Sequence, residues 1–312
     1  MARFGREQMP ALAGRRAVVT GANGGLGYYT ALELARAGAA VILACRNRER
    51  AAAAQARMQA EVPDAQLEVM ILDAADLDSV RAFVAAFSER FESLDILVNN
   101  AGVVMPPLRY TAQGFESQIG TNFLGPFALT GLLLERLQAA PAARIVNIAS
   151  AAHRGGKLDP DDLNWKRRRY RPQYGYAQSK SAILSWTLEL DRRLRAAASP
   201  VQAIATHPGY AATGIIDSDM TMARNPVGRL ALWLGNTLFA HSAADGAWCS
   251  LYAAASPAAV GGDYIGPDGL AEMRGAPRKV GVAAHSRDPD TAGRLWAQAA
   301  ALTGVDYLAP AG

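Results

Sequence analysis

The amino-acid sequence predicts an α/β protein with a doubly wound parallel sheet of about seven strands and helices on both faces. Short segments of continuous apolar character alternate with segments of helical periodicity along most of the 312 residues. A glycine-rich turn follows the first apolar segment directly. Half of the residues are apolar, which is enough for a sheet buried on both faces.

Seven segments read as strands, because each is a short apolar run bounded by turn residues. They are residues 16–20, 40–44, 67–72, 95–99, 144–149, 201–206 and 263–265. Strands that are apolar on both sides are typical of a parallel sheet with helices on each face.

Helical periodicity fills the segments between these strands. Helices are expected from the glycine turn to residue 37 and over residues 48–60, 77–91, about 112–137, the segment around Tyr176, 242–255 and 289–303. The helix at 77–91 is the clearest, because its apolar residues recur on one face: Val80, Phe83, Val84, Phe87 and Phe91. Gly38 ends the first helix, as glycine commonly does.

The chain has no linker rich in Ser or Pro and no internal repeat, so residues 1–312 read as a single domain. It carries an insertion at 151–173, a substrate lid at about 209–240 and a C-terminal tail at 267–312. The lid segment is rich in Met, Leu, Trp and Phe, which favours a bulky apolar substrate.

Composition and charge narrow the class of protein. Cys45 and Cys249 fall in predicted buried elements, and the four histidines show no ligand spacing, so neither a disulfide nor a metal site is expected. The N-terminus lacks the apolar core of a secretory signal, and no segment approaches the ~20 apolar residues that span a bilayer. We therefore expect a cytoplasmic protein with no transmembrane segment.

The net charge of +4 owes much to one basic run, residues 166–171, within the insertion. A solvated loop is the interpretation that we favour. The alternative is a clamp for an anionic substrate or an acidic carrier protein. No aromatic stacking platform surrounds the run, so nucleic acid is not expected as a partner.

The turn after the first strand reads T-G-x-x-x-G-x-G and leads into a helix. A helix N-terminus offers unpaired N–H groups and partial positive charge, and glycines let a pyrophosphate approach the backbone closely. We expect cofactor contacts from Gly21, Asn23, Gly24, Gly25, Leu26 and Gly27. This is a dinucleotide site of the Rossmann type; the alternative is a tight turn that binds no ligand.

The residue that ends the second strand should contact the adenosine ribose, and an acid there would favour NAD. This chain has Arg46 instead, with no acid before Glu49. A guanidinium can bind a 2′-phosphate through its charge and fork geometry. The sequence therefore predicts NADP(H) as the preferred cofactor, with NAD(H) as the second choice; a surface arginine is the other interpretation.

Tyr176 and Lys180 are four residues apart in a helical segment, so their side chains share one face. A phenol with a pKa near ~10 is a poor acid or base at neutral pH unless a cation stabilises its phenolate. Lys180 would supply that cation. The alternative is an ordinary surface pair.

The order of these motifs resembles the short-chain dehydrogenase/reductase family over about residues 15–265. The matches are the glycine turn, Asp73, residues 99–102, Asn122, Ser150, Tyr176 with Lys180, and residues 208–209. Residues 44–47, 120–125 and 207–209 are similar to the retinol dehydrogenase and protochlorophyllide reductase branch.

The resemblance implies several further contacts with the cofactor. Asp73 would contact the adenine ring, and Ala74 beside it replaces a larger apolar residue, which would loosen that pocket. Contacts are also implied for Asn100, Ala101, Gly102, Tyr176, Lys180, Pro208, Gly209 and Thr213.

The resemblance implies catalytic roles for four residues. Ser150 would hydrogen-bond the substrate carbonyl, and Tyr176 would be the general acid in reduction and the base in oxidation. Lys180 would lower the pKa of Tyr176 and hold the nicotinamide ribose. Asn122 precedes Pro126 by four residues, so its carbonyl lacks the usual N–H partner and could hold a water of a proton relay. A simple kink is the other interpretation.

Ser150 and Tyr176 are 26 positions apart, which is wider than in many members of that family. The insertion is therefore expected to be an ordered loop at the mouth of the site.

We expect NADP(H)-dependent interconversion of a carbonyl and an alcohol on a hydrophobic small molecule. A carbon–carbon double-bond reductase is the second enzyme hypothesis, and a nucleotide-binding sensor without turnover is the third. The resemblance favours a homodimer or homotetramer.

Overall fold

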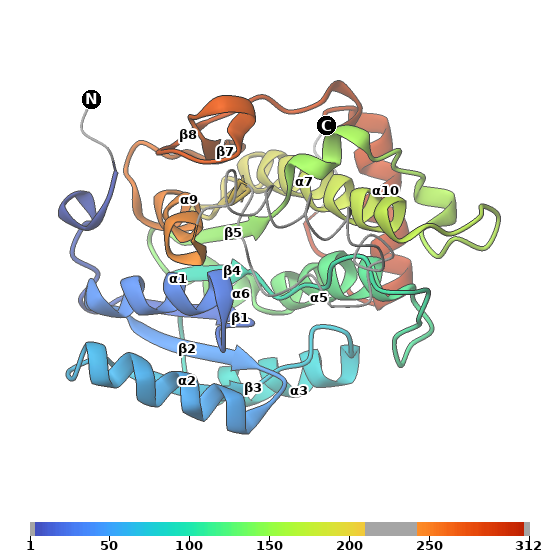
Figure 1. Cartoon of the computed structure of the whole chain (residues 1–312). Helices are drawn as coiled ribbons and strands as arrows, with labels where there is room; N and C mark the ends of the chain where they lie inside the picture. The colour runs from blue at the N-terminus through green and yellow to red at the C-terminus, as the bar shows by residue number, and fades with distance from the viewer. Residues whose placement is uncertain (1–3, 210–241, 309–312) are drawn as a thin grey trace, which may run out of the picture.

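The structure is a computed structural model, and it describes residues 4–209 and 242–308. Its centre is an eight-stranded sheet in the order β3-β2-β1-β4-β5-β6-β7-β8 (Figure 1). The strands are β1 (Arg16–Thr20), β2 (Ala40–Cys45), β3 (Leu67–Ile71), β4 (Ile96–Asn99), β5 (Arg144–Ile148), β6 (Gln202–Thr206), β7 (Tyr264–Pro267) and β8 (Pro277–Lys279). The seven predicted strands are confirmed and are parallel to one another.

The eighth strand, β8, was not predicted. It pairs antiparallel with β7 at the edge of the sheet, inside the segment that the sequence identified only as a tail. Three residues with two exposed side chains carry no alternation strong enough to mark a strand. Only the neighbouring strand makes this segment extended.

Helices cover both faces of the sheet. They are α1 (Gly25–Arg36), α2 (Arg48–Glu61), α3 (Leu77–Ser88), α4 (Ser117–Ile119), α5 (Gly125–Leu132), α6 (Leu134–Gln138), α7 (Pro172–Ala196), α9 (Ala243–Ala255) and α10 (Pro289–Thr303). Short turns of helix are η1 (Arg6–Gln8), η2 (Gly120–Leu124), η3 (Ala151–Gly155), η4 (Pro160–Asp162), η6 (Leu270–Glu272) and η7 (Ala284–Ser286). The cores divide accordingly, with α1, α2 and α9 on one face and α3, α5 and α7 on the other.

The helix predicted over residues 112–137 is shorter and less regular than expected. It begins at Ser117, because the buried Glu116 carboxylate caps it by accepting the N–H groups of Gln118 and Ile119 at 2.8 and 2.9 Å. Residues 120–124 then form a turn of π-helix, in which Gly125 N–H bonds to Gly120 O. Pro126 lacks an N–H group, so a regular α-helical ladder cannot pass this point.

The C-terminal helix is part of the main core. Trp296 of α10 packs edge-on against Phe127 of α5, with ring centroids 5.2 Å apart. Trp186 of α7 donates its indole N–H to the Tyr307 hydroxyl at 3.1 Å. The tail beyond β8 therefore covers α5 and α7 and buries aromatic surface that these helices would otherwise expose.

A buried polar ladder fixes the sheet against its helices beneath the carboxyl ends of the strands. Asn99 of β4 donates to Asn147 of β5 at 2.8 Å and to Thr130 of α5 at 3.1 Å. Asn147 in turn donates to Thr187 of α7 at 2.9 Å. Paired polar groups of this kind have defined geometry, so they set the position of α5 and α7 along the strands.

The structure also bears on the cysteines, on metal binding and on membrane-spanning helices. Cys45 and Cys249 are both buried, as predicted, and neither forms a disulfide. Across residues 4–209 and 242–308, no group of three or more His, Cys, Asp or Glu side chains could hold a metal ion. The same ranges contain no helix long and apolar enough to cross a membrane.

Gly125 marks the closest approach between α5 and the loop after β3. A Cβ atom at this position would lie 2.0 Å from the carbonyl oxygen of Ala74. We expect Gly125→Ala to lower the free energy of unfolding by about 1–3 kcal/mol, because the backbone must shift. Gly293→Ala is the matched control: its Cβ meets nothing within 4 Å, so about 0.5–1 kcal/mol of stabilisation is expected. Denaturant unfolding measures both, and equal effects would contradict this assignment.

Candidate active site

Thr20 and Asn100 join the ends of β1 and β4, where the strand order reverses. The Thr20 hydroxyl accepts the N–H groups of Asn100 and Ala101 at 2.9 and 2.8 Å. The Asn100 amide donates to the Thr20 carbonyl at 2.8 Å. Loops leave a parallel sheet in opposite directions at such a point, so a crevice opens between them at the carboxyl edge.

The glycine turn lies against this junction. Gly21 and Gly25 have φ of +67° and +54°, a region that side chains other than glycine rarely adopt. A Cβ on Gly27 would lie 2.4 Å from the Asn100 amide nitrogen. A Cβ on Gly24, by contrast, would meet nothing within 4 Å, so the N-terminus of α1 is open there. The turn and helix fit a pyrophosphate.

The other residues predicted around the turn lie at the same edge. Asn23 is half-buried in the turn and Leu26 is buried in the first turn of α1. The N–H of Gly21 donates to Ala44 O at 2.8 Å, which places the end of β2 beside the glycine turn. Arg46 follows directly and is exposed, and it has no hydrogen bond or ion pair with any described residue. Its guanidinium is therefore available to an anion.

Asp73 and Ala74 follow β3. The Asp73 carboxylate accepts the Ala75 N–H at 2.9 Å, so the turn itself orients this side chain. Asp73 stays half-buried, whereas Ala74 is buried with its carbonyl against Gly125. This close contact involves the backbone of Ala74, so it accounts for the glycine at position 125. The looser adenine pocket expected from the small side chain at position 74 stays a prediction.

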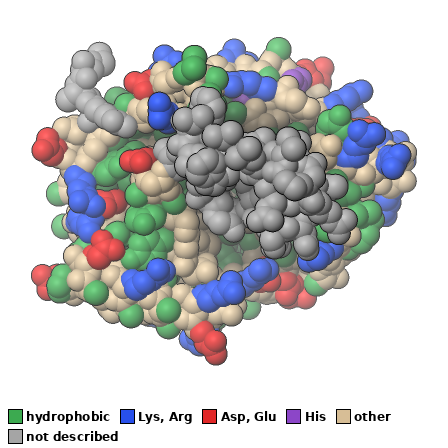
Figure 2. All heavy atoms as spheres, viewed as in Figure 1, with side chains coloured by type: hydrophobic (Ala, Val, Ile, Leu, Met, Phe, Trp, Pro, Cys, Tyr) green, Lys and Arg blue, Asp and Glu red, His purple; other side chains and the backbone are tan. Residues whose placement is uncertain are grey.

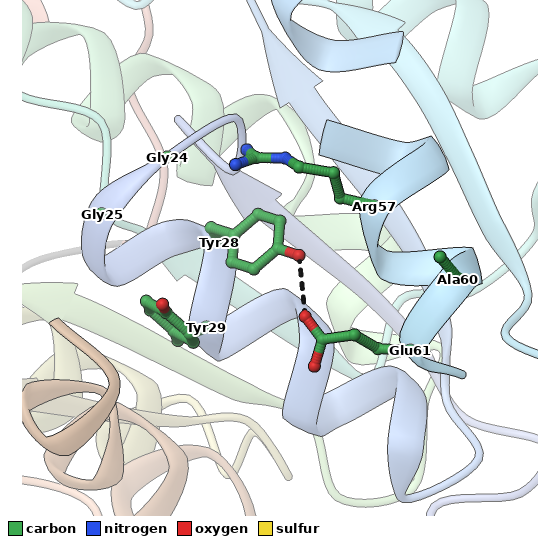
Figure 3. A pocket seen from close by; sticks show the side chains of 7 residues that line it. All are labelled: Gly24, Gly25, Tyr28, Tyr29, Arg57, Ala60 and Glu61. Carbon is green, nitrogen blue, oxygen red and sulfur yellow. Dashed lines mark hydrogen bonds between the residues drawn. The ribbon is translucent and has the colours of Figure 1, made fainter. Parts of the chain in front are cut away.

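A surface pocket of about 420 Å³ adjoins the glycine turn between α1 and α2 (Figure 3). Its lining is Gly24, Gly25, Tyr28, Tyr29, Arg57, Ala60 and Glu61. The Tyr28 hydroxyl donates to Glu61 at 3.2 Å, and the Arg57 guanidinium lies 4.8 Å from the centre of the Tyr28 ring. This pocket shares the open N-terminus of α1 with the crevice, and its two charged side chains, Arg57 and Glu61, both contact Tyr28.

Tyr176 and Lys180 lie on one face of α7, as predicted from their spacing. The Lys180 ammonium donates to the carbonyl of Ile148, the last residue of β5, at 2.7 Å. It lies 5.6 Å from the centre of the Tyr176 ring. Lys180 is 7% exposed, and this burial lowers its pKa to about 7.

Ser150 and Tyr176 are 26 positions apart in the sequence, but their side chains lie close together. Burial raises the pKa of the Tyr176 phenol, and a hydrogen bond from the Ser150 side chain opposes that rise. The Ser150 hydroxyl also accepts the Ala152 N–H at 3.2 Å, which begins η3. The pKa of Tyr176 is therefore raised and not lowered as the charge of Lys180 predicted, because both groups are buried.

Asn122 connects the loop after β4 to α7. Its side-chain amide donates to Val103 O and to the Ser179 hydroxyl, both at 3.0 Å, and its oxygen accepts the Val103 N–H at 2.8 Å. A Cβ on Gly102 would lie 3.0 Å from that oxygen. Sequence reasoning considered only the Asn122 carbonyl and missed this side chain; the water relay stays a prediction.

The insertion at 151–173 is held by Asp162, which the sequence did not single out. Its carboxylate accepts the N–H groups of Lys166 and Arg167 and the Arg168 guanidinium, at 2.7, 3.2 and 2.9 Å. Arg168 also donates to Gln178 of α7 at 2.7 Å. Lys and Arg side chains gather where this insertion lies at the surface (Figure 2). Arg168 is therefore an internal contact, whereas its neighbours in the basic run are exposed. The clamp, the alternative to a solvated loop, would rest on those exposed neighbours.

Pro208 and Gly209 follow β6 at the same edge of the sheet. Gly209 has φ of +78°, and its N–H donates to the ring of the buried His207 at 3.2 Å. Thr213 and the predicted lid from residue 210 onward lie outside the described residues. The positive φ at position 209 explains the glycine there, because only glycine adopts this backbone conformation readily.

Comparisons with known proteins agree with this geometry. A family model described as short chain dehydrogenase matches residues 15–161. Retinol dehydrogenase 13 of Homo sapiens is 41% identical over 95% of this chain and 86% of its own length. Polyprenol dehydrogenase of Mus musculus is 38% identical over 95% of this chain and 86% of its own.

Solved structures show the same fold. An uncharacterized protein from Mycobacterium Paratuberculosis is 40% identical, with a TM-score of 0.81 over 99% of this chain and 100% of that one. A short chain dehydrogenase from Burkholderia cenocepacia J2315 in complex with NADP is 25% identical, with a TM-score of 0.63 over 81% and 96%.

Burial of Lys180 has a consequence for stability. Below about pH 7 both the folded and unfolded chains carry the proton, so the full cost of burying the ammonium is present. From there to the ordinary lysine pKa of 10.5 the folded chain releases its proton first, so stability rises with pH. Lys180→Met should therefore raise the melting temperature most below pH 7.

This advantage should shrink between pH 7 and pH 10.5, because above the ordinary lysine pKa of 10.5 neither state carries the charge. Thermal unfolding across this range, with Lys157→Met as an exposed control, measures the difference. A difference that does not change with pH would contradict the burial of a titrating ammonium at this position.

Proposed function

Because this chain belongs to the short-chain dehydrogenase family, we propose that it is an NADP(H)-dependent oxidoreductase that interconverts an alcohol and a carbonyl on a hydrophobic small molecule. The observation that carries the proposal is the position of the buried Lys180, which is anchored on Ile148 O and lies 5.6 Å from the centre of the Tyr176 ring. Ser150 is close enough to lower the pKa of that phenol. These three groups lie at the carboxyl edge of the sheet, where the glycine turn offers a dinucleotide site.

The chain's own residues account for the proton in this reaction. Ser150 donates a hydrogen bond to the substrate oxygen, and Tyr176 gives that oxygen a proton during reduction. During alcohol oxidation Tyr176 takes the proton instead. Lys180 is anchored on Ile148 O, so its position relative to the phenol is fixed. When bound, the nicotinamide supplies or accepts the hydride.

Two features support an apolar substrate. The relatives named above are dehydrogenases of retinol and of polyprenol, both hydrophobic alcohols. The sequence from residue 220 to residue 239 is also unusually apolar. We therefore propose a long or bulky apolar alcohol, or the corresponding aldehyde or ketone.

The preference for NADP(H) rests on Arg46. It is the first residue after β2, exposed at the edge that holds the glycine turn, and no acidic residue stands in its place. The NADP complex of the structural relative shows that this fold binds the same cofactor elsewhere in the family.

Tyr176→Phe tests the reaction. Without the phenol, kcat for reduction of apolar aldehydes and ketones should fall about 10²–10⁴-fold, because no group remains to transfer the proton. NADPH absorbance gives the rate, and NADPH fluorescence confirms binding. Enones in the same panel test double-bond reduction. If wild type binds NADPH but turns over no compound, the result would favour the hypothesis of a nucleotide-binding sensor.

Arg46→Asp tests cofactor choice. Loss of a charge-assisted contact and its replacement by repulsion should weaken NADPH binding about ten- to hundredfold and leave NADH affinity nearly unchanged. Arg278→Asp makes the same charge change on β8, at the opposite edge of the sheet. Equal NADPH and NADH affinities in wild type would refute the assignment.

A further inference from the structure

The turn between β7 and β8 has an unusual backbone. Ala271 and Glu272 have φ of +50° and +57°, the left-handed region that residues other than glycine rarely adopt. Two such residues in succession cost stability unless surrounding contacts hold them. Backbone hydrogen bonds and the Asp268 carboxylate hold the turn together internally, and the Glu272 carboxylate connects it to the rest of the protein.

One Glu272 oxygen accepts from two sides. It receives a hydrogen bond from Nε2 of His207 at 3.0 Å and from the Arg154 guanidinium at 2.7 Å. Its side chain is 16% exposed, and that of His207 is fully buried. The contact with His207 is therefore shielded from solvent, whereas Arg154 is partly exposed.

The His207 contact determines which ring nitrogen carries the hydrogen. Burial lowers the pKa of His207 to about 4, so its ring is neutral at neutral pH. Nδ1 of His207 accepts the N–H of Gly209 at 3.2 Å, which requires the hydrogen to be on Nε2. An Nε2–H inside the protein needs an acceptor, and Glu272 supplies it.

The Arg154 contact reaches the other wall of the site. Arg154 lies in η3, which begins immediately after Ser150. The β7–β8 turn, which carries Glu272, also packs directly against Gly209, where a Cβ would lie 2.4 Å from Met273 O. The β7–β8 turn thus contacts both the turn after Ser150 and the turn at residues 208–209.

We propose that Glu272 is a positioning residue for the nicotinamide end of the cofactor site. Through His207 it fixes the turn at Pro208 and Gly209, and through Arg154 it fixes the turn that follows Ser150. The inference rests on the proposed function, because it assigns the cofactor's reactive end to these two turns.

A carboxylate with only a stabilising role predicts something different. Loss of such a carboxylate would lower the melting temperature and weaken binding of both halves of the cofactor equally. A positioning role predicts a local effect: the nicotinamide half should bind less well, and the adenosine half, held at the glycine turn and Arg46, should not change. Comparison of NADPH with 2′,5′-ADP separates the two, because 2′,5′-ADP lacks the nicotinamide half.

The decisive variant is Glu272→Leu, which removes the acceptor and keeps a similar volume. We expect the Kd for NADPH to rise about tenfold, as for one lost buried hydrogen bond. The Kd for 2′,5′-ADP should change less than about twofold, and kcat should fall. Glu272→Gln keeps an oxygen for His207, so it should retain most of the NADPH affinity.

Nitrogen-15 NMR of the histidine rings gives a readout that needs neither cofactor nor turnover. In wild type His207 should carry its hydrogen on Nε2, and in Glu272→Leu the population should shift towards Nδ1. Lys279→Met removes the ion pair with Asp263 in the same hairpin without touching His207, so it controls for general loosening. It should leave the NADPH to 2′,5′-ADP ratio unchanged.

The outcomes are distinct. Parallel losses for NADPH and 2′,5′-ADP, or an unchanged His207 tautomer in Glu272→Leu, would overturn the positioning role. Unchanged NADPH affinity and kcat in Glu272→Leu would overturn it as well. Failure of wild type to bind NADPH would instead refute the proposed function, and this inference with it.

Discussion

The Thr20–Asn100 junction is the constraint on which the site depends. In a parallel sheet all strands end at one edge, but a crevice forms only where neighbouring loops separate. Here one hydroxyl and one amide hold the ends of β1 and β4 together, and Gly27 packs against that amide. The glycine turn is thereby presented with its helix N-terminus open, as a phosphate site requires.

The proposed catalytic groups, Tyr176 and Lys180, show how burial competes with charge. A lysine near a phenol stabilises the phenolate in water, but both side chains here lose solvation, which favours their neutral forms. The Ser150 hydrogen bond acts in the opposite direction on Tyr176. A protein that holds such groups for chemistry accepts a cost in stability at that position.

Segments distant in the sequence complete the site. Asp162 orders the insertion and connects it through Arg168 to α7, close to Tyr176. Asn122 connects the loop after β4 to the same helix through Ser179. From the far end of the chain, Glu272 reaches His207 and Arg154. The loops around the crevice are thus held by side-chain contacts, which irregular backbone needs in place of a ladder.

The sequence by itself determined the seven parallel strands, the glycine turn and the pairing of Tyr176 with Lys180, because these depend on local apolar periodicity, backbone freedom and helical spacing. Tertiary structure alone decided that residues 277–279 form β8, that the Asn122 side chain bonds to Val103 and Ser179, and that burial raises the pKa of Tyr176. Contacts such as Glu272 with His207 join residues 65 positions apart. No local pattern encodes them, since they arise only when the chain has packed.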